Sequence, residues 1–107
     1  MENVKFLVSS DDQNRISSLE ISGLLVLENS QQIKIELIKI AELLGSQVEI
    51  TIMEPEEMDL SFIQLLLGFI RRMDEINVTY HFNWNLDEDQ KFLFEHVGLS
   101  KVIYMNS

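Results

Sequence analysis

The sequence predicts an α/β domain in which helices pack against a mixed β-sheet. Runs that alternate apolar and polar residues, typical of strands, take turns along the chain with runs of helical period. The first two strand-like runs are joined by a short polar connection, which favours an antiparallel hairpin and hence a mixed sheet. No Pro/Gly/Ser-rich linker divides the 107 residues, so we expect one domain over 1–107. The predicted order is β-β-α-β-α-β-α, with a possible final strand.

The first half of the chain provides a hairpin and a helix. Residues 4–8 and 15–21 are rich in β-branched and apolar side chains and form the two hairpin strands, the second ended or bent by Gly23. Residues 31–44 place apolar side chains at steps of three and four, which predicts an amphipathic helix. Its expected end signals are an N-cap at Asn29–Ser30 and a C-terminal stop at Gly45.

The second half alternates strands and helices. Residues 47–53 alternate as a strand, and Pro55 in the loop 54–57 prevents that strand from continuing. A helix is expected over 60–75, followed by a strand over 77–82. The remaining predicted features are Asn85 as a cap, a helix over 86–96 that starts with three acids, Gly98 as its stop and the final strand at 101–105.

The charge balance excludes several classes of partner. Eighteen acidic and eight basic residues give a net charge of −10, which argues against nucleic acid and against anionic membrane surfaces. The chain has no cysteine, so disulfides, thiolate nucleophiles and cysteine-ligated metals are excluded. The longest uncharged apolar run, 60–70, is shorter than the roughly 20 residues of a membrane span. With no signal peptide pattern, we expect a soluble cytoplasmic protein without direct membrane insertion.

No catalytic, cofactor or metal motif stands out, and the chain is not expected to be an enzyme. His81 and His96 lack the spacing of a metal-binding pair, and the four glycines cannot form a phosphate-binding loop. Acidic residues gather between the strand 47–53 and the next helix, where ligands of open α/β sheets often bind. A magnesium site and helix capping both suit this group, and capping is the favoured interpretation; its members are Glu54, Glu56, Glu57 and Asp59.

The helix at 60–75 is apolar nearly all round, whereas a surface helix normally has one polar face. Either the helix is unusually buried or part of its surface binds a partner. The sequence leaves both explanations open.

At this helix the chain resembles the STAS domain (sulfate transporter and anti-sigma factor antagonist). The similar segments are 48–67, a strand ending in glycine at 19–25 and a closing helix with a Gly-Leu pair at 94–103. Asp59 matches the family's Asp at the start of the helix. Leu60 occupies the position at which anti-sigma factor antagonists carry a phosphorylated Ser or Thr, and Phe62 replaces the family's Gly. The usual phosphorylation switch is therefore expected to be absent, and Ser61 is the remaining candidate phosphosite.

The resemblance implies a STAS-like mixed sheet and a regulatory protein–protein interaction module in bacterial signalling. The implied partner is an anti-sigma factor, a related kinase or a transporter ATPase, with a basic rim around an apolar groove. A STAS-like small-molecule or lipid-binding module, or a transport-complex subunit, is the alternative, with an apolar cavity expected between helix and sheet. Self-association is left open. The expected contact surface is Glu56, Glu57, Asp59, Ser61, Phe62, Gln64 and Leu65, with its apolar side chains exposed.

Overall fold

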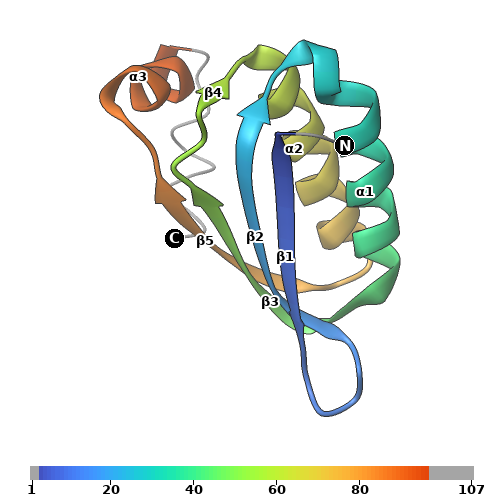
Figure 1. Cartoon of the computed structure of the whole chain (residues 1–107). Coiled ribbons are helices and arrows are strands. Elements are labelled where there is room, and N and C mark those ends of the chain that lie inside the picture. Colours follow the sequence, from blue (N-terminus) through green and yellow to red (C-terminus); the bar gives the residue numbers. More distant parts are fainter. Residues whose placement is uncertain (1–2, 97–107) are drawn as a thin grey trace.

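One mixed sheet organises the chain, as the sequence predicts. The computed structural model describes residues 3–96, and Figure 1 shows their arrangement. The elements are β1 (Val4–Ser10), β2 (Ile16–Leu25), a 3-10 turn η1 (Leu27–Asn29), α1 (Ser30–Leu43), β3 (Leu44–Met53), β4 (Glu57–Met58), α2 (Leu60–Glu75), β5 (Thr79–Asn85) and α3 (Glu88–His96). The predicted Gly98 stop and the strand at 101–105 lie outside the described residues.

The strand order is β1-β2-β3-β5, and β4 pairs with β2. β1 and β2 form the expected antiparallel hairpin, while β2, β3 and β5 run parallel. Each parallel pair is joined by a helix, so α1 and α2 both return across the sheet in the same direction. β4 was not predicted, because two residues are too short to show a period; it forms where Glu57 and Met58 pair with the end of β2.

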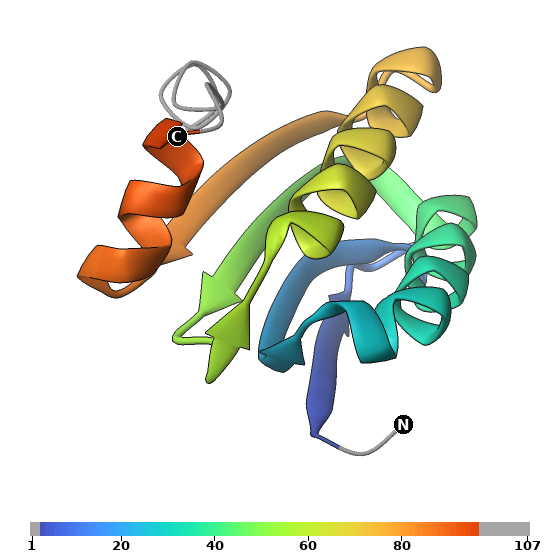
Figure 2. The ribbon, with the colours of Figure 1, turned by 90° about the horizontal axis from the view of Figure 1, so that it is seen from above.

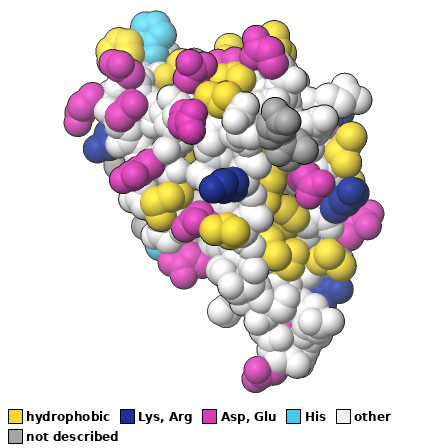
Figure 3. Space-filling view, viewed as in Figure 1, with side chains coloured by type: hydrophobic (Ala, Val, Ile, Leu, Met, Phe, Trp, Pro, Cys, Tyr) yellow, Lys and Arg dark blue, Asp and Glu magenta, His cyan; other side chains and the backbone are white. Residues whose placement is uncertain are grey.

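The sheet has one covered and one open face. Figures 1 and 2 show α1 and α2 side by side on the same face, with α3 beside the end of β5. The core between these layers is almost entirely apolar, and its largest fully buried side chains include Leu19, Ile21, Ile33, Ile50, Ile52, Phe62, Met73 and Phe82. Three aromatic rings join β5 to α3: Phe82 packs against Trp84, and Trp84 packs against Phe94, each pair with ring centroids 4.8 Å apart. Figure 3 gives the space-filling view from the side of Figure 1: acidic side chains lie mainly at the left and top, and a group of hydrophobic side chains lies right of centre.

The end of α1 differs from the prediction. Gly45 does not stop the helix; it is the second residue of β3, and Leu44 is already extended. The free carbonyls at the helix end are bound instead by Arg15, whose guanidinium donates to Glu42 O at 2.8 Å and to Leu44 O at 3.0 Å. A cation at a helix C-terminus also suits the negative end of the helix dipole. The chain can therefore pass from helix to strand without a glycine turn.

The predicted N-caps were also wrong in part. The side chain of Asn29 donates to Leu24 O at 2.9 Å rather than capping α1. Asn85 is the last residue of β5, and Asp87 caps α3. Asp87 Oδ1 accepts from Gln90 N at 2.8 Å while Gln90 Oε1 accepts from Asp87 N at 3.1 Å, a reciprocal capping box. The helix therefore starts two residues later than expected.

The helix α2 has the predicted bounds, and its C-terminal cap explains why β5 begins at Thr79 rather than at residue 77. Asn77 adopts a left-handed conformation, with φ of 61°. Asn77 N donates to Asp74 O and Val78 N donates to Met73 O, which is the hydrogen-bond pattern of a Schellman motif. These residues complete the helix and cannot pair as a strand.

Candidate functional site

The N-terminus of α2 is organised by Asp59. Its Oδ1 accepts from the backbone N–H of Ser61 at 3.0 Å and from the Ser61 hydroxyl at 2.5 Å. Its Oδ2 accepts from Leu27 N at 3.0 Å, in the connection between β2 and α1. One carboxylate therefore caps the helix and joins it to a loop 32 residues earlier.

The pKa of Asp59 reflects this environment. Partial burial raises the pKa, but hydrogen bonds from the Ser61 hydroxyl and from the backbone of Leu27, Ser61 and Phe62 together outweigh burial and lower it below the ordinary aspartate value. Asp59 is therefore ionised at neutral pH. Its negative charge also lies at the positive end of the α2 dipole, which is the favourable position for a carboxylate.

Two further hydrogen bonds hold the β3–α2 connection in place. Glu56 N donates to Gly23 O at 2.9 Å, next to the short β4 pairing. On the other side, the buried side chain of Gln90 donates from Nε2 to Pro55 O at 2.8 Å. Gln90 thus caps its own helix and also binds α3 to the loop. The β3–α2 connection is thus hydrogen-bonded to β2 on one side and to α3 on the other.

These contacts surround an acidic hollow of about 440 Å³ at one end of the molecule. Six of its lining residues are acidic and none of the described ones is basic: Glu28, Glu56, Glu57, Asp59, Asp87 and Asp89, beside Val26, Met58 and Gln90. Figure 3 shows acidic side chains crowded at the upper end, over α3 and β4. Within residues 3–96, no group of three or more His, Asp or Glu side chains is placed to hold a metal ion.

The structure divides the seven predicted contact residues into separate groups. Glu56, Glu57 and Asp59 line the acidic hollow, and half-buried Ser61 lies beside it, bonded to Asp59. Phe62 has 0% exposure and belongs to the core, so its prediction as an exposed anchor was wrong. The sequence shows an apolar side chain on nearly every side of this helix, and periodicity alone could not tell which side faces the sheet. The last two predicted residues, Gln64 and Leu65, lie in a different place.

Gln64 and Leu65 line an apolar groove of about 340 Å³ between α1 and α2. The whole lining is Lys34, Leu37, Ile38, Ala41, Gln64, Leu65, Gly68, Phe69 and Arg72, which we call the interhelical groove. The sequence predicted an apolar cavity between helix and sheet; the apolar hollow found in the described residues lies between two helices instead.

Sequence reasoning missed two exposed apolar side chains at the acidic end. Leu27 is 65% exposed and Leu60 is 46% exposed; the backbone of Leu27 donates to Asp59, and Leu60 follows Asp59 in the sequence. Leu60 was predicted only as a replaced phosphorylation site. Leu27 carries no periodic signal, because it lies in a 3-10 turn. The sequence alone does not show that these two side chains stay exposed, because exposure depends on how the elements pack together.

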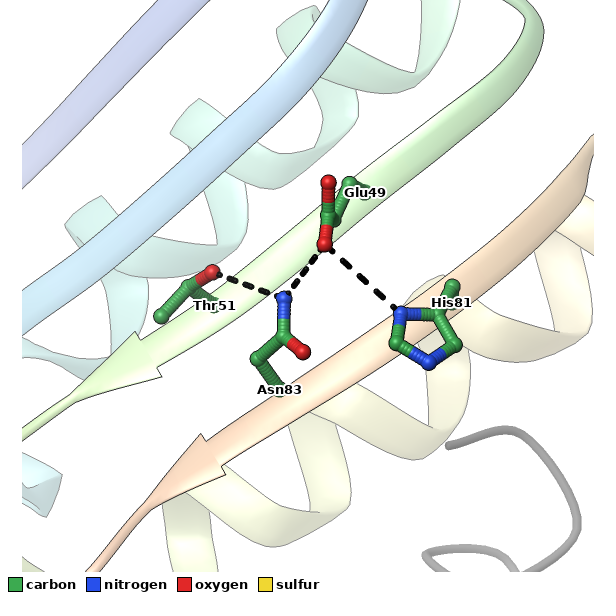
Figure 4. Close-up of polar contacts among 4 residues, drawn as sticks. All are labelled: Glu49, Thr51, His81 and Asn83. Atoms are coloured by element: carbon green, nitrogen blue, oxygen red, sulfur yellow. Dashed lines mark hydrogen bonds and ion pairs between the residues drawn. The ribbon is translucent and has the colours of Figure 1, made fainter.

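The open face of the sheet carries a polar cluster on β3 and β5 (Figure 4). Asn83 Nδ2 donates to Glu49 Oε1 at 2.8 Å and to Thr51 Oγ1 at 3.3 Å, and His81 Nδ1 lies 3.8 Å from the same Glu49 oxygen. Both His81 and Glu49 are exposed, so the ion pair formed on protonation of His81 is weak. His81 therefore faces solvent on the open side of the sheet.

Comparison with known proteins identifies the fold. No family model and no curated protein matches the sequence. Among solved structures, an anti-sigma factor antagonist from Mycobacterium paratuberculosis superposes with a TM-score of 0.75 at 11% identity, covering 92% of this chain and 81% of that one. SpoIIAA in its unphosphorylated form gives 0.68 at 16% identity, with coverage of 91% and 84%. The phosphorylated form, from Bacillus, gives 0.62 at 16% identity, with coverage of 91% and 86%. The chain therefore has the STAS-like fold of anti-sigma factor antagonists. No helix within residues 3–96 is long and apolar enough to cross a membrane.

Proposed function

We propose that this chain is a non-catalytic regulatory module of the bacterial cytoplasm that binds a protein partner at its acidic end. The observation that carries the proposal is the acidic hollow, together with exposed Leu27 and Leu60, which are neighbours in sequence of its lining residues Val26, Glu28 and Asp59. Apolar side chains inside a charged rim are the usual composition of a protein-binding surface. The shared fold with anti-sigma factor antagonists supports the same kind of role.

The partner is expected to present basic side chains around an apolar patch. Six carboxylates around one hollow would attract such a surface and accelerate its docking. An anti-sigma factor, a related kinase or a transporter ATPase with a basic rim would suit it. Glu56, Glu57 and Asp59 supply the charge, while Leu27 and Leu60 supply apolar contact.

The interaction is proposed to be independent of phosphorylation. Leu60 has no hydroxyl, and the Ser61 hydroxyl already donates to the ionised Asp59. A phosphate on Ser61 would remove that donor and bring about −1.5 to −2 charges next to a carboxylate. Ser61 remains the candidate phosphosite, and mass spectrometry of the native protein showing stoichiometric phosphate there would contradict the proposal of an unswitched surface.

A pair of matched variants tests the surface. Leu60→Gln removes an exposed apolar side chain at the acidic end, and Leu43→Gln removes one of similar exposure, 51% against 46%, at the opposite end of α1. Wild type and both variants are used to capture partners from the native lysate, after circular dichroism shows that all three are folded. We expect Leu60→Gln alone to lose the partner at least about tenfold. Equal recovery by all three would overturn the proposed surface.

The alternative function is the binding of a small molecule or lipid. The observation that favours it is the interhelical groove, whose volume of about 340 Å³ lies at the lower end of the range for ligand pockets. Native mass spectrometry of protein purified from its own cells discriminates the two proposals. A reproducible bound mass that Gly68→Leu removes supports ligand binding, and the apo mass alone contradicts it.

A further inference from the structure

Gly68 is out of place in the interior of a helix. It lies in the middle of α2, where glycine is about 1 kcal/mol less favourable than alanine. Packing does not require it, because a Cβ built at Gly68 meets no described atom within 4 Å. The missing side chain instead leaves the floor of the interhelical groove open. A locally unfavourable residue with no folding reason points to a role in binding.

The groove carries charge of one sign at both ends. Lys34 lies one turn after the start of α1, and Arg72 lies one turn before the end of α2. Because both helices run in the same direction across the sheet (Figure 1), the two cations are separated by about eight residues along the axis, or about 12 Å. Arg72 has only a weak exposed ion pair with Glu75, at 3.4 Å. The groove therefore suits an elongated occupant with an anion at each end and an apolar middle.

A single-headed lipid satisfies one cation only, whereas α3 of this same chain has the matching pattern. Gln90 and Phe94 are its buried side chains, and the opposite face presents Glu88, Phe92 and Glu95 at positions i, i+4 and i+7, with exposed Lys91 at the edge of this face. Phe92 is 63% exposed although its ring stacks on His96. The two carboxylates are about 10 Å apart along the helix, close to the spacing of the groove cations.

We propose that α3 of one copy docks in the interhelical groove of a second copy. Phe92 would fill the space above Gly68, and Glu88 and Glu95 would pair with Lys34 and Arg72. This is an amphipathic helix bound in an apolar groove, the mode by which helical segments are commonly recognised. The contact between α3 and the groove uses neither Leu27 nor Leu60, so its test is independent of the test of the proposed partner surface. A net charge of −10 on each copy opposes association, so association is measured at an ionic strength of about 0.15 M, at which repulsion between distant charges is largely screened.

The first experiment measures mass against concentration by sedimentation velocity, starting from the 12.5 kDa monomer. Wild type should form a larger species as its concentration rises to about millimolar, the Kd range of a weak association. Gly68→Leu fills the groove and Phe92→Ser removes the anchor, so each should weaken association at least about tenfold. The matched control, Leu43→Gln, should associate like wild type. A wild type that stays monomeric, or association unchanged by both variants, overturns the proposal and leaves the groove to another occupant.

The second experiment tests the charges in trans. The variant Lys34→Glu/Arg72→Glu and the variant Glu88→Lys/Glu95→Lys should each fail to self-associate, while their mixture should form a complex. Because the charges are reversed at both ends of the groove and of α3, the mixture can form a complex whichever way α3 lies in the groove. The control is Lys5→Glu/Lys39→Glu, which has the same net charge as the groove variant but leaves the groove intact. This control should self-associate like wild type, whereas the groove variant of equal net charge should not. Loss of self-association by the control to the same extent, or a mixture of the groove variant and the α3 variant that forms no complex, would contradict the pairing.

Discussion

Replacing Gly68 by alanine should raise the free energy of unfolding by about 1 kcal/mol. Alanine is favoured over glycine by this amount in a helix interior, because glycine loses more backbone entropy on folding. In the structure, a Cβ added at Gly68 meets no atom of residues 3–96 within 4 Å, so alanine fits there without repacking. For a domain of this size, about 1 kcal/mol corresponds to a rise in Tm of roughly 4–8 °C.

Gly23→Ala is the contrasting variant. Gly23 has a φ of +103°, and a Cβ there would lie 2.0 Å from Asn3 O, a backbone atom that cannot move aside cheaply. Strain and clash together should cost more than about 2 kcal/mol. Urea unfolding followed by circular dichroism measures both variants against wild type. A Gly68→Ala protein no more stable than wild type would show that a Cβ is not accommodated freely at this position. Packing would then explain the glycine, and a role in binding would no longer be needed.

Three other substitutions test the fold at the acidic end. Asp59→Ala removes the helix cap and the bond to Leu27 and should cost about 1–2 kcal/mol at neutral pH. Because the pKa of Asp59 is lowered in the folded state, this contribution is present above the ordinary aspartate pKa and is lost as the pH falls through the folded value, so urea titrations of variant and wild type should converge in acid. Gln90→Ala breaks the capping box and leaves Pro55 O without its buried donor, which should cost about 2 kcal/mol in chemical denaturation. Phe62→Ala should cost about 3–5 kcal/mol in the same assay; a loss below 1 kcal/mol would contradict its place in the core.

The elements of this fold could be predicted because their signals are local. The helix α2 was predicted to the residue, since its start and its Asp59 cap are adjacent in sequence. The hairpin and the parallel strands followed from alternation and from connection length. The end of α1 could not be predicted in this way, because its cap is Arg15, 29 residues before the Leu44 carbonyl that it binds. A glycine near the expected position was the only local signal, and it was misleading.

The candidate site was predictable only where it lies on one segment. Glu56, Glu57 and Asp59 follow one another and do lie together. The rest of the hollow comes from Val26 and Glu28 before α1 and from the start of α3, which the Gln90 bond brings to the loop from 35 residues away. Phe62 was misplaced because nearly every side of α2 is apolar, so the pattern does not identify the buried face. The interhelical groove depends on an absent side chain at Gly68, and an absence leaves no periodic signal.

The bonds that hold the acidic end have a consequence for the speed and cost of docking there. Leu27, the β3–α2 connection and α3 are joined through Asp59 and Gln90 before any partner arrives. Ordering a loop on binding usually consumes part of the interaction free energy. Here that ordering is completed when the chain folds, so a partner that bound the proposed surface would lose little conformational entropy of this loop on contact. A small apolar area within the acidic rim could then support rapid, reversible exchange of partners.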